Sequence, residues 1–272
     1  VVITGQTIDI TESLLIGIRN GLSGSFDGNM SQVGLWNSTL TANEISSLYN
    51  HGLPIDLTTN QAAYASSSNL VGYWRMGSGT LDNYPLIADQ TNATLGSELI
   101  TNGDFANGTT GWTTGNSGVL SIVDGALVVT GDGGSFASAK QIVTGVVGKT
   151  YKLTGKVAVV SGSYNVRVEA DQPSWLNLFT TSSTDFVNFE VYFVCVNTSI
   201  DLRFTIYNAT TTSSDKIKID DISLKELGGN PAMMINLGGG ADFSDGIKNG
   251  SPYANMVQNG TFDTDTDWSK YT

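Results

Sequence analysis

The chain has 272 residues, with 13 basic against 25 acidic side chains and a formal net charge of −12 at pH 7. Because an acidic surface repels phosphate backbones, nucleic acid is excluded as an expected partner. No apolar run reaches the roughly 18 residues that a membrane-spanning helix needs, so we expect no membrane insertion. The 32 glycines and a charged fraction of only 14% favour short strands and tight turns, and therefore an all-β protein.

Residues 1–57 predict strands followed by one short helix near 41–50. Thr41 and Glu44 have the spacing of a capping box, which marks where a helix begins. The apolar stripe of this helix consists of Leu40, Ile45, Leu48 and Tyr49.

Three motifs in this segment suggest a family. They are Phe26-Asp27-Gly28, Val33-Gly34-Leu35-Trp36-Asn37 and the run from Ile45 to Gly52. Together they resemble the C-terminal half of laminin G-like, or concanavalin A-like, jelly rolls. The resemblance implies that residues 1–57 form part of an antiparallel sandwich. Residues 58–97 are rich in Ser, Thr and Asn and predict a connector that packs on its neighbours through Trp74.

Residues 98–227 contain eight apolar stretches separated by Gly, Asn, Asp and Ser turns, which predicts an antiparallel jelly-roll β-sandwich. The eight predicted strands are 119–123, 126–130, 135–143, 150–160, 164–170, 186–196, 200–207 and 216–224. No helical pattern separates them. A buried Cys195 is expected, since it continues the alternating run from Phe189.

This region opens with Asn102-Gly103-Asp104-Phe105 before Trp112 and closes with Ile219-Asp220-Asp221-Ile222-Ser223-Leu224. These motifs resemble carbohydrate-binding modules of families four and nine, which implies a non-catalytic sandwich that binds sugars. The opening motif returns as Asn259-Gly260-Thr261-Phe262 before Trp268. We therefore predict a Gly-rich linker at 228–255, the truncated start of a second module at 256–272, and tandem sandwiches joined by Gly/Ser/Asn-rich linkers. Trp112 and Trp268 are interpreted as core residues.

Alternation along the strands predicts the two sides of the sheets. The predicted core side contains Tyr164, Val166, Val168, Ala170, Phe189, Val191, Phe193, Cys195, Leu202, Phe204 and Ile206. The opposite side contains Asn165, Arg167, Glu169, Glu190, Tyr192, Asp201, Arg203, Thr205 and Tyr207. Aromatic rings stack on sugars while Arg and Glu bind paired hydroxyls. The candidate sugar-binding residues are Arg167, Trp175, Glu190, Tyr192, Arg203 and Tyr207.

Two alternatives stay open for these residues. The face could be an ordinary solvated one with cross-strand charge pairs such as Arg167 with Glu190. Trp175, expected in or beside a loop, serves either as an exposed stacking platform or as packing under that loop.

Asp104 and Asp220 are candidate ligands for a structural calcium ion, with turn capping as the alternative. Alternation sends Asp220 and Asp221 to opposite faces, so only one of them would serve. The acidic run Asp263-Thr264-Asp265-Thr266-Asp267 predicts a solvated turn, since it lacks the glycine and glutamate of a helix-loop-helix calcium site.

Catalysis is not expected. The single histidine, His51, has no nucleophile motif or metal-ligand spacing near it, and we predict that the chain is not an enzyme. The tandem arrangement resembles structural proteins of tailed bacteriophages. That resemblance implies a tail fibre or capsid decoration protein, located on the virion surface or otherwise outside cells. It also implies a homo-oligomer whose partners are glycans or the host cell surface and other virion subunits. The alternatives are a secreted bacterial adhesin, the non-catalytic arm of a polysaccharide-degrading enzyme, or a purely structural spacer.

Overall fold

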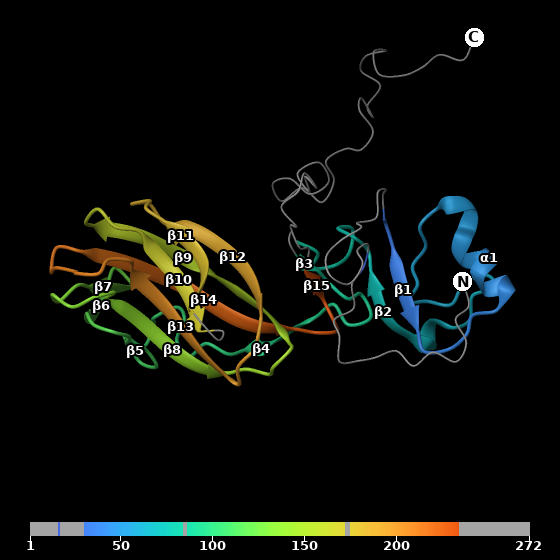
Figure 1. The fold of residues 1–272 in the computed structure, drawn as a ribbon, viewed down its shortest axis with the longest axis horizontal. Helices are drawn as coiled ribbons and strands as arrows, with labels where there is room; N and C mark the ends of the chain where they lie inside the picture. The colour runs from blue at the N-terminus through green and yellow to red at the C-terminus, as the bar shows by residue number, and fades with distance from the viewer. Residues whose placement is uncertain (1–15, 17–29, 84–85, 172–174, 234–272) are drawn as a thin grey trace, which may run out of the picture.

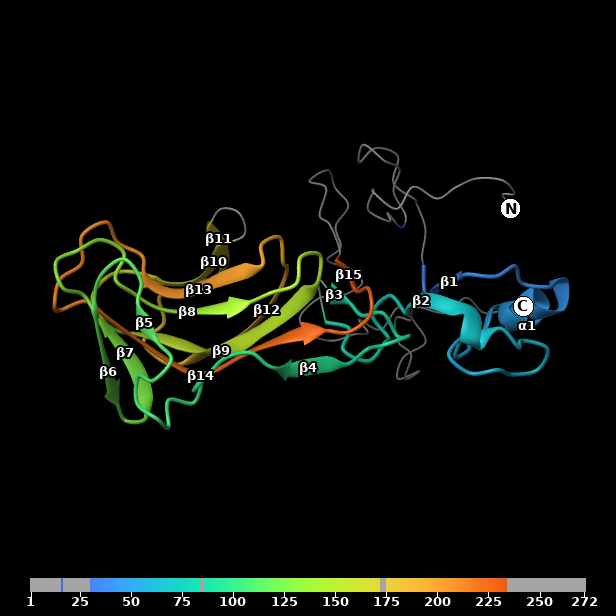
Figure 2. The same cartoon turned by 90° about the horizontal axis from the view of Figure 1, so that it is seen from below.

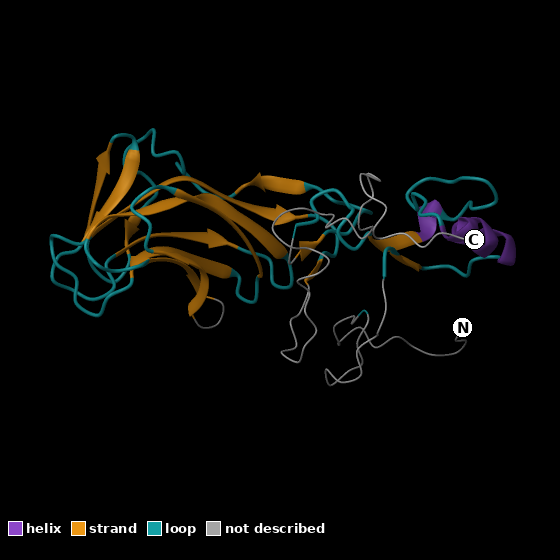
Figure 3. Ribbon diagram, turned by 90° about the horizontal axis from the view of Figure 1, so that it is seen from above, coloured by secondary structure: helices purple, strands orange, loops and turns teal. Residues whose placement is uncertain are grey.

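A computed structural model describes residue 16 and residues 30–83, 86–171 and 175–233. The strands predicted before residue 30, most of the predicted linker, the second module from 256, Trp268 and the acidic run at 263–267 lie outside the described residues. Strands dominate what is described, and the fold is an antiparallel jelly-roll sandwich with one short α-helix (Figures 1 and 3). The predicted fold class is confirmed.

Two sheets face one another in the sandwich (Figure 2). The five-stranded sheet runs in the order β11 (Trp175–Thr181), β10 (Val166–Asp171), β13 (Ser199–Ile206), β8 (Ser138–Thr144) and β5 (Thr113–Thr114). The six-stranded sheet runs in the order β12 (Val187–Val194), β9 (Thr150–Ser161), β14 (Lys216–Leu227), β7 (Ala126–Thr130) and β6 (Val119–Val123), with β4 (Leu95–Glu98) also paired to β14. Every pairing is antiparallel.

All eight predicted strands are present. The pattern missed β4, β5 and β11, which are short or polar and carry little apolar alternation. Pairing of β4 with β14 extends the sheet to Leu95, ahead of the predicted boundary at residue 98.

Side chains that alternate inward from both sheets form one core. Phe204 is fully buried, with ring centroids 5.7 Å from Trp112 and 6.3 Å from Phe189. Phe193 is 3% exposed and stacks on Tyr151 at 5.9 Å. The predicted core residues that are buried are Val166, Val168, Ala170, Phe189, Phe193, Cys195, Leu202, Phe204 and Ile206. Val191 is partly buried and packs against this core, whereas the prediction for Tyr164 fails: it precedes β10 and is 38% exposed.

The opening motif of the module builds its own local structure. Asn102 adopts a left-handed backbone with φ 54°, and its side chain donates to the carbonyls of Gly108 and Thr110. Its own carbonyl accepts from Trp112 Nε1 at 3.1 Å. Gly103 lies so close to the carbonyl of Ile222 that a Cβ there would clash. The sequence from Asn102 to Trp112 thus forms a turn that holds the Trp112 ring in the core. The predicted burial of Trp112 is confirmed, since it is 4% exposed.

Ahead of the sandwich lies a smaller unit. The strand β1 (Val33–Trp36) pairs with β2 (Leu70–Trp74), and between them lie α1 (Ala42–Tyr49) and the 3-10 turns η1 (Asn50–Gly52) and η2 (Ser67–Asn69). The capping box of Thr41 and Glu44 is confirmed. Within the apolar stripe, Leu40 and Leu48 are partly buried, whereas Ile45 and Tyr49 are 55% and 69% exposed. Glu44 is buried instead, and its carboxylate accepts bonds from Ala65 N and Ser66 Oγ.

The connector joins this unit to the end of the sandwich. Trp74 is 5% exposed, as predicted for a packed side chain, and its Nε1 donates to the carbonyl of Asn230 at 2.9 Å. Fully buried Asp89 accepts from Asn230 N and from Tyr73 N. The short strands β3 (Leu86–Ile87) and β15 (Ala232–Met233) pair beside these contacts. Within the described residues no helix is long and apolar enough to cross a membrane.

Candidate functional site

The structure divides the six candidate sugar-binding residues between two sheets. Glu190 and Tyr192 belong to β12 in the six-stranded sheet, whereas the other candidates belong to the five-stranded sheet. The expectation of a single face is wrong, because the outer sides of opposed sheets point away from one another. The candidates that share the five-stranded sheet are Arg167, Trp175, Arg203 and Tyr207.

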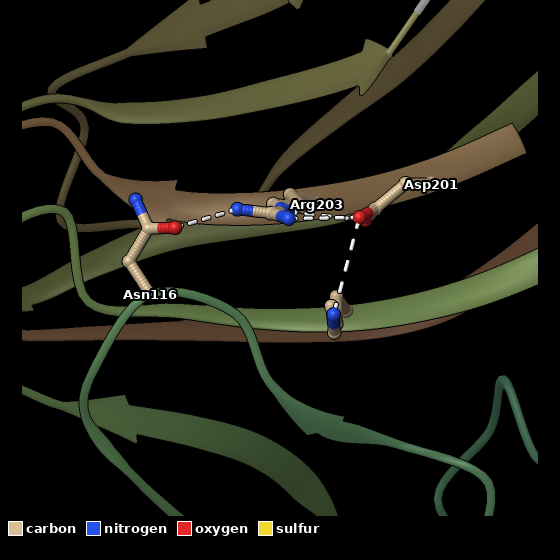
Figure 4. Close-up of polar contacts among 4 residues, drawn as sticks. Asn116, Asp201 and Arg203 are labelled. Carbon is tan, nitrogen blue, oxygen red and sulfur yellow. Dashed lines mark hydrogen bonds and ion pairs between the residues drawn. The ribbon is translucent and has the colours of Figure 1, made fainter.

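Arg203 lies on the outer face of the five-stranded sheet, with Asp201 and Asn116 on either side of its guanidinium (Figure 4). Its Nε donates to Asp201 Oδ1 at 3.0 Å and its Nη2 to Asp201 Oδ2 at 2.8 Å, a two-pronged contact. Nη1 donates to Asn116 Oδ1 at 2.8 Å, and Lys140 Nζ lies 4.0 Å from the same carboxylate. This network fixes the guanidinium and prevents it from sampling other rotamers.

Trp175 lies against that guanidinium. Arg203 Cζ is 4.2 Å from its ring centroid, and the tryptophan is 45% exposed. The residue was expected in or beside a loop, but it is the first residue of β11 and pairs with Asp171 of β10. An indole anchored to a strand on one side and open to solvent has the geometry of a stacking platform.

A second cation–π pair lies on the same face. Arg167 Cζ is 3.2 Å from the ring centroid of Tyr207, which directly follows β13 and is 42% exposed. Phe136 adds a ring 5.4 Å from Tyr207. Arginine and an aromatic ring therefore form two separate pairs on this face.

Glu169 and Thr205 were expected to be solvated, yet they are only 9% and 3% exposed. The register places Thr205 opposite Arg167, and Glu169 opposite Arg203. Long arginine stems cover neighbouring surface, which accounts for this burial.

Glu190 and Tyr192 instead attach the connector to the six-stranded sheet. Glu190 Oε2 is 2.7 Å from Lys152 Nζ, and its Oε1 accepts from Tyr192 Oη and from Asn83 Nδ2 of the connector. The proposed charge pair of Arg167 with Glu190 is therefore wrong. Burial opposes ionisation of Glu190, but the bonds from Lys152, Tyr192 and Asn83 together lower its pKa. Burial, followed by the bond to Glu190, raises the pKa of Tyr192.

The candidate calcium ligands have partners within the chain. Asp220 and Asp221 lie 3.1 Å and 2.7 Å from Lys156 Nζ, although alternation had placed them on opposite faces. A bulge in β14 with Asp221 at φ 54° brings both to the same lysine. Asp104 accepts from Ala106 N at 3.2 Å, as a turn cap does. In the described part of the chain, no three His, Cys, Asp or Glu side chains group as metal ligands, and the structural calcium ion stays a prediction.

Two further predicted residues have clear positions. Cys195 is fully buried, as predicted; its Sγ bonds to the carbonyl of Asn197 at 2.8 Å, and burial raises the pKa of the thiol. His51 lies exposed in η1, away from the candidate face.

Sequence reasoning missed Asn116, Lys140 and Phe136 as part of the face. Asp201 and Arg203 are two residues apart in a strand and therefore lie on the same side of the sheet, so their contact could have been predicted from alternation. Asn116 comes from the segment between β5 and β6, and no periodicity in the sequence points to Arg203 as its partner.

No family model matches the chain, and no curated protein matches it either. Solved structures that it resembles are carbohydrate-binding modules with jelly-roll sandwiches. One is described as CBM4, with 18% identity over 47% of this chain and 99% of that chain and a TM-score of 0.37. Another is the CBM22-1 xylan-binding domain from Paenibacillus barcinonensis Xyn10C, with 14% identity over 51% of this chain and 97% of that chain and a TM-score of 0.39. A third is TmCBM61 in complex with β-1,4-galactotriose, with 16% identity over 47% of this chain and 97% of that chain and a TM-score of 0.37.

Proposed function

We propose that this chain is a non-catalytic, glycan-binding part of a larger extracellular protein. The glycan lies on the outer face of the five-stranded sheet, with Trp175 as its stacking platform. The observation that carries this proposal is the half-exposed indole held against Arg203, whose guanidinium is itself fixed by Asp201 and Asn116.

The chemistry of this arrangement suits a sugar. A pyranose ring presents an apolar C–H face to an aromatic ring and hydroxyl groups at its rim. Side chains that are already ordered lose little conformational entropy when they bind, so a fixed arginine and carboxylate beside the indole favour affinity. Weak single sites of this kind gain strength when modules act in tandem.

In the finer proposal, the larger protein is a tail fibre or capsid decoration of a tailed bacteriophage, located at the virion surface. Its partners would then be the host cell surface, other virion subunits and further copies of the chain. This location is supported by two features of the sequence. The tandem modules resemble structural proteins of tailed bacteriophages, and the opening motif at Asn102 recurs at Asn259. A secreted adhesin or an enzyme's binding arm would use the same face in the same way.

A purely structural spacer is the second candidate. It is favoured by the contacts that join the connector to the sandwich, namely Trp74 with Asn230, Asn83 with Glu190, and the pairing of β3 with β15. Such contacts hold consecutive units at a set angle. A spacer, however, has no use for an exposed indole anchored by a fixed arginine.

The test is glycan-array binding of the full chain with two matched aromatic variants. Trp175→Ala is expected to lose about 10-fold in affinity, since an aromatic stacking contact contributes up to about 1.5 kcal/mol beyond the apolar area it buries. Tyr192→Ala, which lies on the other sheet, is expected to bind as the unaltered chain does. A blank array from folded protein would support the spacer. Equal loss in both variants would contradict the assignment of the site to one face.

A further inference from the structure

Three buried polar atoms on the candidate face have no hydrogen-bond partner. They are Arg167 Nε, Thr205 Oγ1 and Ser138 Oγ. The register aligns them in one row across three neighbouring strands: Arg167 of β10 lies opposite Thr205 of β13, which lies opposite Ser138 of β8. Side chains directly opposite one another in a sheet have Cβ atoms about 5 Å apart. The unsatisfied atoms therefore form a cluster and are not scattered defects.

Unpartnered buried atoms of this kind raise the free energy of the folded chain. Leaving a buried donor or acceptor without a partner costs about as much as losing a hydrogen bond, so native structures keep only a few such groups and rarely place several side by side. Ser138 and Thr205 are 0% and 3% exposed, which removes bulk water as their partner. A ligand group that supplies hydrogen-bond acceptors at this row would remove the cost.

The two arginines of the face differ sharply. Arg203 donates three hydrogen bonds to Asp201 and Asn116. Arg167 rests on the Tyr207 ring, and its nearest carboxylate oxygen, Glu169 Oε1, is 4.0 Å from Nη1, beyond hydrogen-bonding length. Within the described residues the Arg167 guanidinium has no hydrogen-bond acceptor, so its planar fork of donors is free.

We propose that this row binds the carboxylate of an acidic sugar, so that the chain recognises acidic glycans such as those containing uronic acids. This rests on the proposed function of the face. The Arg167 fork matches a carboxylate in shape and charge, and the hydroxyls of Ser138 and Thr205 are further donors beside it. The ring of the sugar lies beside Tyr207 and Phe136. Because Ser138 and Thr205 are buried, and Gly115 lies against the Ser138 hydroxyl, binding through these hydroxyls requires the Arg167 side chain and the segment at Gly115 to move.

Other ligand chemistry fits the row less well. A neutral sugar brings hydroxyls, which can accept bonds but do not balance the positive charge of Arg167. A basic ligand would meet that charge directly. The overall charge of −12 weakens long-range attraction of an acidic glycan, so recognition depends on short-range contacts at the row.

The experiment uses the full chain and matched pairs of polysaccharides in affinity electrophoresis and calorimetry. Polygalacturonate, alginate and hyaluronan are each compared with their carboxyl-reduced forms, which keep the chain but lose the charge. We expect at least one acidic form to bind at least about 10-fold more tightly than its reduced form, and its affinity to fall as salt rises. Arg167→Gln should abolish this preference, and Arg167→Lys should restore only part of it because an ammonium lacks the fork.

Arg75→Gln is the matched control, since Arg75 Nε is also buried without a partner but lies in the connector after β2, away from the row. It should leave the preference unchanged. Binding of neutral and acidic forms alike, still dependent on Trp175, would overturn this inference and leave the proposed function standing. Absence of any binding by folded protein would overturn both. An acidic preference that survives Arg167→Gln would place the carboxylate elsewhere and overturn the role of the row.

Discussion

The outer faces of the two sheets show opposite ways of using polar side chains. On the six-stranded sheet, Glu190 is paired with Lys152, Tyr192 and Asn83, and Lys156 with Asp220 and Asp221, so the charges are satisfied within the chain. On the five-stranded sheet, Trp175 stays half exposed and Arg167 keeps free donors. A face whose polar groups are satisfied stabilises the molecule, whereas a face with unsatisfied groups is available to a ligand.

The largest expected effect is on the free energy of unfolding, and it tests whether core residues and outer-face residues have been assigned correctly. Phe204→Ala in the five-stranded sheet and Phe193→Ala in the six-stranded sheet should each lower the free energy of unfolding by about 3 to 5 kcal/mol, because each deletes a buried ring and leaves a cavity. Tyr207→Ala on the outer face should cost less than about 1 kcal/mol. Urea denaturation measures all three. A Tyr207→Ala cost equal to that of Phe204→Ala would mean that the outer face is part of the core.

A smaller effect isolates the unsatisfied row by comparing two buried threonines. Thr211 is fully buried and its Oγ1 donates to the carbonyl of Gly134 at 2.8 Å, so Thr211→Val should cost about 1 kcal/mol. Thr205→Val removes a hydroxyl that has no partner, and its cost should be near zero or favourable. Thermal melts of the two variants provide the comparison. Equal destabilisation would show that the Thr205 hydroxyl is already satisfied in the free protein.

The smallest effect is a pH dependence confined to the six-stranded face. The pKa of Glu190 is lower in the folded chain than the ordinary value of a glutamate, so its ionised form stabilises the fold above that ordinary value and the contribution is lost as the pH falls through the folded pKa. Glu190→Gln should therefore melt below the unaltered chain at pH 6, and the difference should shrink as the pH falls below the ordinary glutamate pKa of about 4.3. A difference that stays constant over this range would contradict an ionic role for Glu190.

Some local features could be read directly from residue order. The capping box at Thr41 and Glu44 and the burial of Trp112 and Cys195 are determined by short-range spacing and alternation. The bulge at Asp221 could not be read in this way, because one additional residue in a strand changes which side chains share a face without altering the apolar pattern. The strand β11 was missed because its apolar residues, Trp175, Leu176, Leu178 and Phe179, do not follow a two-residue period.

The sequence by itself determined an all-β antiparallel fold, eight of its strands and most of the inward residues of three of them, because a strand's two-residue period is a local property. Only the tertiary structure decided which strands share a sheet. Glu190 and Arg167 have the same alternation, yet they point to opposite sides of the molecule, since sheet order is set by long-range pairing that adjacent residues do not encode. The contact of Arg203 with Asn116 and the free donors of Arg167 follow from that pairing, and they define the candidate site.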